Sequence, residues 1–167
     1  MRLLAALDLR LLRLLRTRAH SPPVENSLIW LARAGENGLL WHALALGGAA
    51  LGGGRRREAY VLAMKVVLAT LMANTIVKQT VRRARPVLEE ELPALTPVLS
   101  GRSYPSAHSS TSFAGARALS AAGLPAAPLY AVAVAMALSR PYLGVHYPSD
   151  IVAGAALGDA VARFMTP

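Results

Sequence analysis

The sequence predicts an all-α integral membrane bundle of about five transmembrane helices, preceded by an amphipathic helix at the membrane interface. Hydrophobic residues make up 54% of the 167 residues and charged residues only 16%, whereas a soluble domain carries about 25% charged residues. The chain still has a net charge of +9, and its arginines punctuate apolar runs. That placement favours contact with lipid headgroups and argues against nucleic acid as a partner.

Residues 1–20 are expected to form the interfacial helix. Six leucines share one helical face, at positions 3, 4, 7, 11, 14 and 15, and three arginines (Arg10, Arg13 and Arg16) fall outside it. An apolar stripe flanked by arginine is typical of a helix that lies in the interface and reaches anionic lipid. Packing on a soluble partner is the alternative. Pro22 and Pro23 are expected to break this helix.

Residues 21–167 are expected to form one transmembrane domain. Its apolar spans run over about 37–54, 60–85, 106–122, 126–139 and 149–164. Several are shorter than the ~20 residues that cross a bilayer, so we expect polar turns to extend their ends. Frequent Ala and Gly suit close helix packing in lipid. The absence of Cys excludes disulfides, and no metal-ligand spacing such as HExxH occurs.

Three polar stretches stand at the ends of these spans. The second span ends in KQTVRRARP, where Lys78, Arg82 and Arg85 share a helical face and Arg83 points elsewhere. The third span opens at Ser106, a natural N-cap whose first turn offers unpaired N–H groups to an anion. Alone, these features also suit a helix anchor and an ordinary cap.

The third stretch, SRPYLGVHYPSD, holds Arg140, His146 and Asp150. A carboxylate four residues from an imidazole can orient one ring nitrogen and leave the other free to attack or to accept a proton. An interhelix loop with Asp150 as a helix cap is the plainer alternative. If consecutive spans are antiparallel, all three stretches meet on one side of the membrane. So many cations in one place predict a bound phosphate.

Together, K-x6-RP from residue 78, PSAH from residue 105 and SR-x5-H-x3-D from residue 139 resemble the three-part signature of the type 2 phosphatidic acid phosphatase (PAP2) superfamily. Two features depart from that pattern. Ala107 stands where the family usually has Gly, and the first of the family's usual six transmembrane helices is reduced to the interfacial helix.

The resemblance implies a metal-independent lipid phosphate phosphatase that needs no cofactor. His146 would attack phosphorus and form a phosphohistidine, Asp150 would hold its ring, and His108 would protonate the leaving oxygen and then activate water. The remaining residues that the resemblance assigns would hold the phosphoryl oxygens: Lys78, Arg85, Ser106, Ala107 through its N–H, and Arg140. Arg82 is a candidate specificity residue.

The resemblance also implies a lipid-linked phosphate as substrate in the plasma membrane of a bacterium. Five N-terminal arginines oppose the triplet at 55–57, and positive-inside counting then favours a cytoplasmic active site. The short chain and this topology resemble the small PAP2 branch that dephosphorylates decaprenylphosphoryl-5-phosphoribose in arabinan precursor synthesis for the cell wall. Undecaprenyl diphosphate and phosphatidylglycerol phosphate are the alternative substrates. A haloperoxidase, a non-catalytic scaffold and a homo-oligomer stay open.

Overall fold

The computed structural model describes residues 2–18, 20–87, 94–97 and 101–166. The regular secondary structure of these residues is helical. The elements in order are α1 (Arg2–Thr17), α2 (Pro22–Ala34), the 3-10 turn η1 (Glu36–Gly38), α3 (Leu39–Leu51), α4 (Gly54–Val81), α5 (Ala107–Ala121), α6 (Ala126–Tyr142) and α7 (Pro148–Met165). Over the described ranges the only β pairing is an isolated bridge between Ala84 and Arg102. The predicted all-α class is confirmed.

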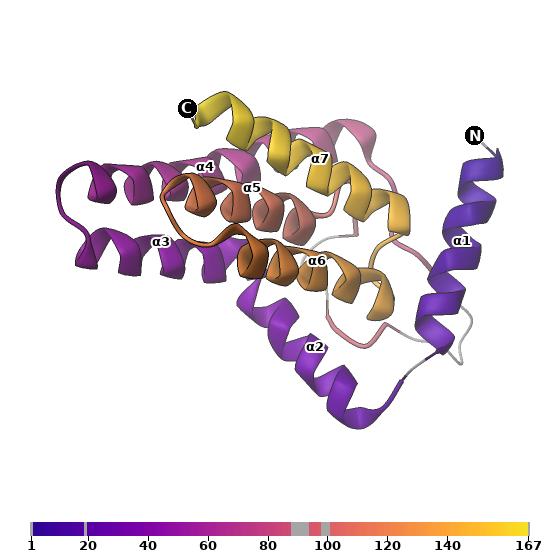
Figure 1. The fold of residues 1–167 in the computed structure, drawn as a ribbon. Helices are drawn as coiled ribbons and strands as arrows, with labels where there is room; N and C mark the ends of the chain where they lie inside the picture. Colours follow the sequence, from indigo (N-terminus) through magenta and orange to yellow (C-terminus); the bar gives the residue numbers. More distant parts are fainter. Residues whose placement is uncertain (1, 19, 88–93, 98–100, 167) are drawn as a thin grey trace.

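Helices α3 to α7 run lengthwise beside one another, and α5 lies among the other four (Figure 1). Trp41 of α3, Val66 of α4 and Leu119 of α5 are fully buried in the core that these helices share. The indole N–H of Trp41 donates to Ser112 Oγ at 3.0 Å, which satisfies the one polar group of that buried ring. The core therefore fixes α5 as the element against which the site is built.

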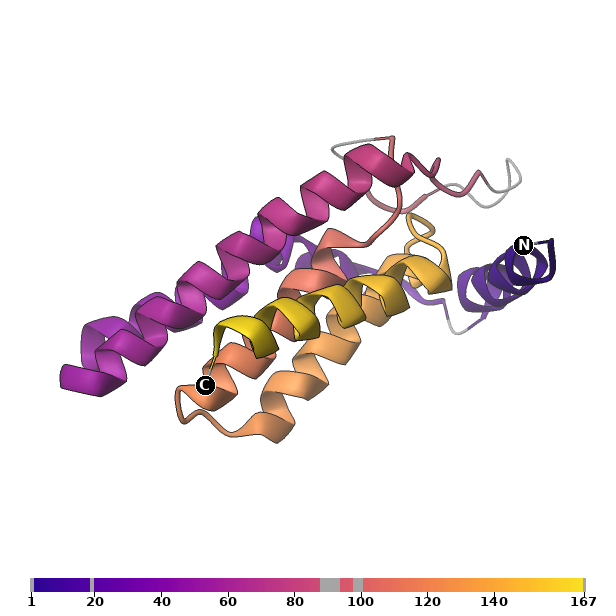
Figure 2. The same cartoon turned by 90° about the horizontal axis from the view of Figure 1, so that it is seen from above.

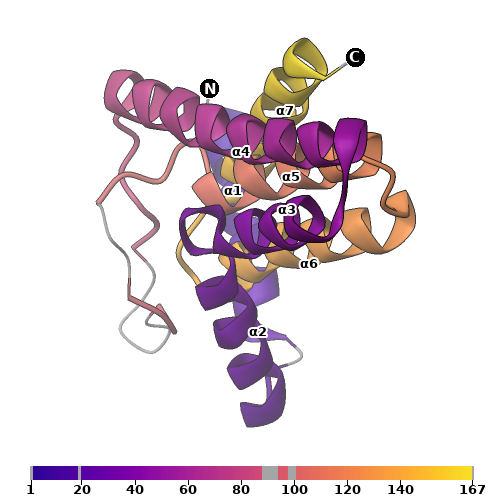
Figure 3. The ribbon, with the colours of Figure 1, turned by 90° about the vertical axis from the view of Figure 1, so that its left-hand side faces the viewer.

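Two N-terminal helices stand outside this bundle. Helix α1 crosses its end near the start of α7, as the view from above shows (Figure 2). Helix α2 runs away from the bundle and contacts α6 (Figure 3). Of α1, Asp8, Leu12 and Arg16 are buried, whereas six leucines are exposed: Leu3, Leu4, Leu7, Leu9, Leu11 and Leu14. The leucine stripe that the sequence indicates therefore faces outward.

Helices α5 and α7 approach each other through glycines of α7. A Cβ added at Gly154 would lie 2.6 Å from the carbonyl oxygen of Ser106, and one added at Gly158 would overlap the carbonyl oxygen of Ser110. A methyl group fits at neither position, so the two helices pack backbone to backbone, as small residues allow in membrane bundles. This contact sets the separation of the two helices that carry PSAH and Asp150.

Helix α1 ends at Thr17, ahead of Pro22 and Pro23 as expected, and these prolines then begin α2, because the first helical turn has no use for the N–H that proline lacks. One expectation about boundaries is wrong. The second span does not reach Arg85: α4 ends at Val81, and Arg82 adopts a left-handed conformation with φ 53°.

By length and composition, α4 is the one helix in the described part of the chain that could cross a membrane by itself. Its 28 residues extend about 42 Å at 1.5 Å per residue. The other bundle helices have 13 to 18 residues. The expected count of five crossings stays a prediction.

Candidate active site

The three polar stretches of the sequence meet at one end of the bundle, around a cavity of about 300 Å³. Six of the sequence-predicted site residues line this cavity: Lys78, Arg85, Ala107, His108, Arg140 and His146. Ser106 and Asp150 are fully buried, outside that lining. The structure therefore brings these eight residues together from the ends of α4 and α6, the segment after α4, the start of α5, the loop before α7 and the first turn of α7.

The starts of α5 and α7 are tied together. Ser106 caps α5, with its Oγ accepting from Ser109 N–H at 3.4 Å, and its own N–H donates to the carbonyl of Asp150 at 3.0 Å. Ala107 begins the helix, and within the described residues the non-glycine positions with positive φ are Asn37 and Arg82. The substitution of Ala for the usual Gly at 107 thus introduces no backbone strain.

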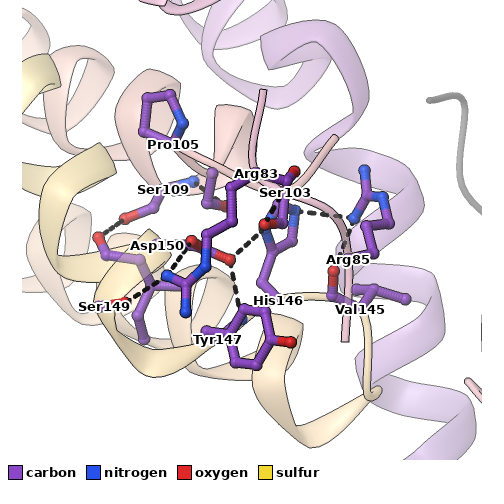
Figure 4. Close-up of polar contacts among 12 residues, drawn as sticks. Arg83, Arg85, Ser103, Pro105, Ser109, Val145, His146, Tyr147, Ser149 and Asp150 are labelled. Carbon is purple, nitrogen blue, oxygen red and sulfur yellow. Dashed lines mark hydrogen bonds and ion pairs between the residues drawn. The ribbon is translucent and has the colours of Figure 1, made fainter. Parts of the chain in front are cut away.

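His146 lies in the loop between α6 and α7 with 2% of its surface exposed. Its Nε2 is 3.1 Å from Nη1 of Arg85, and its Nδ1 is 3.5 Å from Oδ2 of Asp150 (Figure 4). A guanidinium can only donate, so Nε2 is the unprotonated nitrogen and Nδ1 carries the proton that faces the carboxylate. Burial, reinforced by the positive charges of Arg85 and Arg140, lowers the pKa of His146 to about 4, against the opposing effect of Asp150. The imidazole is neutral near pH 7.

Two further residues hold Asp150 besides its contact with His146. Its Oδ2 accepts from the Tyr147 N–H at 2.9 Å, and its Oδ1 accepts from Arg83 at 2.9 Å. The Arg83 guanidinium also stacks 3.9 Å over the Tyr147 ring. On a helical wheel that runs through Arg85, Arg83 would point away from the motif face. Since α4 ends at Val81, the wheel does not apply there, and Arg83 turns inward (Figure 4).

Arg82 lies outside the cavity lining. It is exposed, and its Nε donates to the carbonyl of Gln79 at 2.9 Å at the end of α4. A cation there complements the last carbonyls of the helix. The specificity role of Arg82 therefore stays a prediction.

His108 is oriented by the backbone of a helix that the sequence analysis missed. Its Nε2 lies 2.9 Å from the carbonyl oxygen of Ala32 in α2, so that nitrogen must donate and Nδ1 is the one left to exchange a proton. The Pro-Pro pair followed by Glu25 in the first turn is a helix-start signal that could have revealed α2. No sequence signal marks the carbonyl contact.

The cavity is built for an anion. Arg140 is 5% exposed, and its Nε has no hydrogen-bond partner among the described residues. Arg85 is fixed by donating to the carbonyl of Val145 at 2.7 Å, and Lys78 lines the same space. Bringing such cations together without a counter-charge is costly, and the tetrahedral oxygens of phosphate suit several such donors at once. A lining rich in Lys and Arg suits phosphate rather than a metal ion.

The chain is similar in sequence to known proteins. The family model of the PAP2 superfamily matches residues 59–167. The chain is 42% identical over 141 residues to decaprenylphosphoryl-5-phosphoribose phosphatase of Mycobacterium tuberculosis (strain CDC 1551 / Oshkosh), covering 81% of this chain and 75% of that protein. It is 38% identical over 125 residues to the protein of the same name from Mycolicibacterium smegmatis (strain ATCC 700084 / mc(2)155), covering 74% and 67%.

Two crystal structures share the fold. Aquifex aeolicus LpxE has a TM-score of 0.75 at 25% identity, covering 95% of this chain and 94% of that one. A transmembrane PAP2 type phosphatidylglycerolphosphate phosphatase from Bacillus subtilis has a TM-score of 0.81 at 20% identity, covering 99% and 85%.

Proposed function

The chain belongs to the PAP2 superfamily, and from that membership we propose that it hydrolyses a phosphomonoester of a lipid-linked substrate through a phosphohistidine on His146. One observation carries the proposal: Lys78, Arg85 and Arg140 converge on the cavity that both His146 and His108 line. Phosphoryl transfer needs little from a protein beyond positioning and charge stabilisation, and this cavity supplies both.

In the first step, the lone pair on Nε2 of His146 attacks phosphorus and the bond from phosphorus to the leaving oxygen breaks. Asp150 faces Nδ1 and stabilises the positive charge that the ring gains. His108, which takes up its second proton when the anionic substrate is bound, gives the Nδ1 proton to the leaving oxygen, while the Ala32 carbonyl holds its other N–H. The cations stabilise the equatorial oxygens as charge shifts between them.

In the second step, water attacks the phosphohistidine on the opposite face of phosphorus. His108, left neutral by the first step, takes the proton from that water at Nδ1. The nitrogen–phosphorus bond breaks, inorganic phosphate leaves, and His146 returns to its neutral form. The capped N-terminus of α5, with Ser106 and the N–H of Ala107, faces negative charge throughout. Each residue therefore ends the cycle in the protonation state in which it began.

The substrate that we propose is the 5-phosphate of decaprenylphosphoryl-5-phosphoribose, in the synthesis of cell-wall arabinan precursors. Support comes from two curated relatives with that activity in their names, at 42% and 38% identity. The test is phosphate release by the purified full-length protein from a panel that includes undecaprenyl diphosphate and phosphatidylglycerol phosphate, with EDTA present. We expect vanadate to inhibit, because it mimics five-coordinate phosphorus. Activity lost on chelation and restored by a divalent ion would contradict the mechanism.

We propose further that the protein is a multi-pass protein of the bacterial plasma membrane and that its cavity faces the cytoplasm. The apolar length of α4 and the arginines of α1 support this placement. Because the chain has no Cys, a Val87→Cys variant gives a single label site just beyond α4, at a residue that is 90% exposed. An impermeant thiol reagent should label it only after cell lysis. Labelling of intact cells would show that the cavity faces the opposite side of the membrane.

A further inference from the structure

The inner face of α1 carries a carboxylate that reaches the proposed catalytic pair. Asp8 is 3% exposed, although it lies on an otherwise leucine- and arginine-rich helix. Its Oδ1 accepts from the Ser149 N–H at 2.9 Å, and its Oδ2 accepts from the Ser149 hydroxyl at 2.5 Å and from Arg83 at 2.8 Å. Helix α1 is thereby hydrogen-bonded to the first turn of α7, 141 residues away in sequence.

Arg83 joins this carboxylate to Asp150. One Nη donates to Asp8 and the other donates to both Asp150 and Ser149, at 2.9 and 2.7 Å. Burial alone would raise the pKa of Asp8, but the hydrogen bonds from Ser149 and Arg83 lower it below its usual value. Asp8 is therefore ionised at neutral pH, and one guanidinium lies between two carboxylates.

The charge balance decides what Asp8 can do. Asp8, Arg83 and Asp150 sum to one negative charge, so this group of three keeps a net negative charge with which to stabilise the imidazolium of His146. If Asp8 were neutral, Asp150 would be the one charged carboxylate left beside Arg83 among these three residues. The pair would then be neutral and would attract the cationic ring less strongly. Arg83 would also lose one of the two anchors that fix where it holds Oδ1 of Asp150.

We propose that Asp8 is a positioning residue for the phosphatase reaction, acting through Arg83 and Ser149 on Asp150 and so on His146. This inference rests on the function proposed above. Asp8 touches neither the proposed nucleophile nor the cavity lining, so its effect is on the rate of phosphoryl transfer and not on phosphate binding. It makes α1, a helix outside the matched family region of 59–167, part of the catalytic apparatus.

Helix α7 provides a matched control for the test. Asp159, near its other end, pairs with Arg117 at 3.3 Å and with Arg163 at 2.7 Å, and is 30% exposed. Asp159→Asn therefore removes the same charge from another arginine-paired carboxylate of the molecule, far along the helix from His146. Any general cost of losing a carboxylate should be shared by the two variants.

In purified full-length protein acting on a lipid phosphate, Asp8→Asn should lower kcat about 10- to 100-fold, since displacement of a reacting group by 1 Å can cost about 100-fold. KM should change less than about twofold, because Lys78, Arg85 and Arg140 are untouched. Asp159→Asn should change neither. Asp8→Glu should recover part of the rate. Should Asp8→Asn not fold, Ser149→Ala takes its place, with a smaller loss of kcat and the same unchanged KM.

A double-mutant cycle separates positioning from structural damage. If Asp8 acts through Asp150, Asp8→Asn should cost little further activity in an Asp150→Asn background, so the two effects are not additive. An equal cost in both backgrounds would overturn the proposal. So would a loss no larger than that of Asp159→Asn, or a rise in KM with kcat unchanged.

A readout without turnover keeps this inference distinct from the proposed function. In ¹⁵N-histidine spectra assigned with His146→Ala, the wild type should show the His146 proton fixed on Nδ1. Asp8→Asn should give a mixture of tautomers or a shifted titration, and Asp159→Asn should not. An unchanged His146 resonance in Asp8→Asn would overturn the inference. A wild type inactive on every lipid phosphate, with that resonance shifted, would overturn the proposed function alone.

Discussion

The two cavity histidines are held by different means. His146 faces a side-chain carboxylate four residues along the chain, whereas His108 is bonded to the backbone carbonyl of Ala32, 76 residues away in α2. The first arrangement places negative charge beside the ring and suits a nucleophile that becomes cationic. The second fixes one N–H without adding a full charge, which suits a ring that must both give and take a proton. The groups that contact the two histidines therefore indicate which ring acts as the nucleophile and which as the acid and base.

Removing His146 should have the largest effect. His146→Ala should lower turnover by about 10⁴-fold or more, the order expected when a nucleophile is lost. Acid-labile, base-stable phosphate should be trapped on the wild type after a rapid quench and be absent from the variant. His42→Ala, a change at a half-buried histidine outside the cavity lining, is the control. Phosphate trapped on His108, or on Ser106 as an acid-stable ester, would reverse the assignment.

Removing His108 should have an effect that depends on the leaving group. A general acid is worth about 10²–10⁴-fold, so His108→Ala should lose that much on an alkyl phosphate and much less on an aryl phosphate with a good leaving group. The measurement is the pre-steady-state release of the leaving group, which reports the first step alone. Equal losses on both substrates would remove the distinction between the two histidines.

A variant that disturbs the surroundings of His108, and not those of His146, would test the difference between the two histidines further. A Cβ at Gly35, just after α2, would lie 2.9 Å from Cδ2 of His108 and overlap the side chain of Met136. Gly35→Ala should therefore lower the rate about tenfold on the alkyl phosphate, an order set by small displacements of a reacting group, and spare the aryl phosphate. At Gly47 a Cβ meets nothing within 4 Å, so Gly47→Ala should keep full activity. Equal losses on the two substrates would show that Gly35 supports the fold generally.

The smallest effect is a titration. Because burial lowers the pKa of His146 to about 4, its imidazole resonance should titrate near pH 4 and not near the ordinary pH of about 6.5. The folded state binds this proton less tightly than the unfolded chain does. The contribution to the free energy of unfolding is therefore fully present above pH 6.5 and is lost as the pH falls towards 4. A midpoint near 6.5 would mean that the ring is exposed or that Asp150 dominates.

Sequence reasoning reached the parts of the site that local chemistry specifies. Ser106 after a proline reads as a cap, and the spacing of His146 and Asp150 reads as an oriented imidazole; the structure brings both to one cavity. The antiparallel order of the spans was enough to place them together. These features depend on neighbours within four residues, so one stretch of sequence contains them.

The remainder depends on contacts that no short stretch contains. The inward turn of Arg83 follows from the end of α4 at Val81, and helix ends are fixed by tertiary packing as much as by propensity. Asp8 is the one acidic residue among residues 1–20, and its partners are 75 and 141 residues away. The role of Ala32 belongs to its carbonyl group, which every residue has. Such contacts leave no mark in residue type.

The close approach of α5 and α7 has a consequence for how phosphate enters and leaves. Neither Gly154 nor Gly158 has room for a methyl group against α5, so sliding or parting these helices would break a dry, close-packed contact. We therefore expect the two helices to form a rigid side of the cavity. Phosphate would then leave through the other sides of the cavity. There η1 and the end of α4 contribute Asn37 and Gln79, which are both exposed. We therefore expect the side of the cavity formed by α5 and α7 to be more rigid than the side formed by η1 and the end of α4.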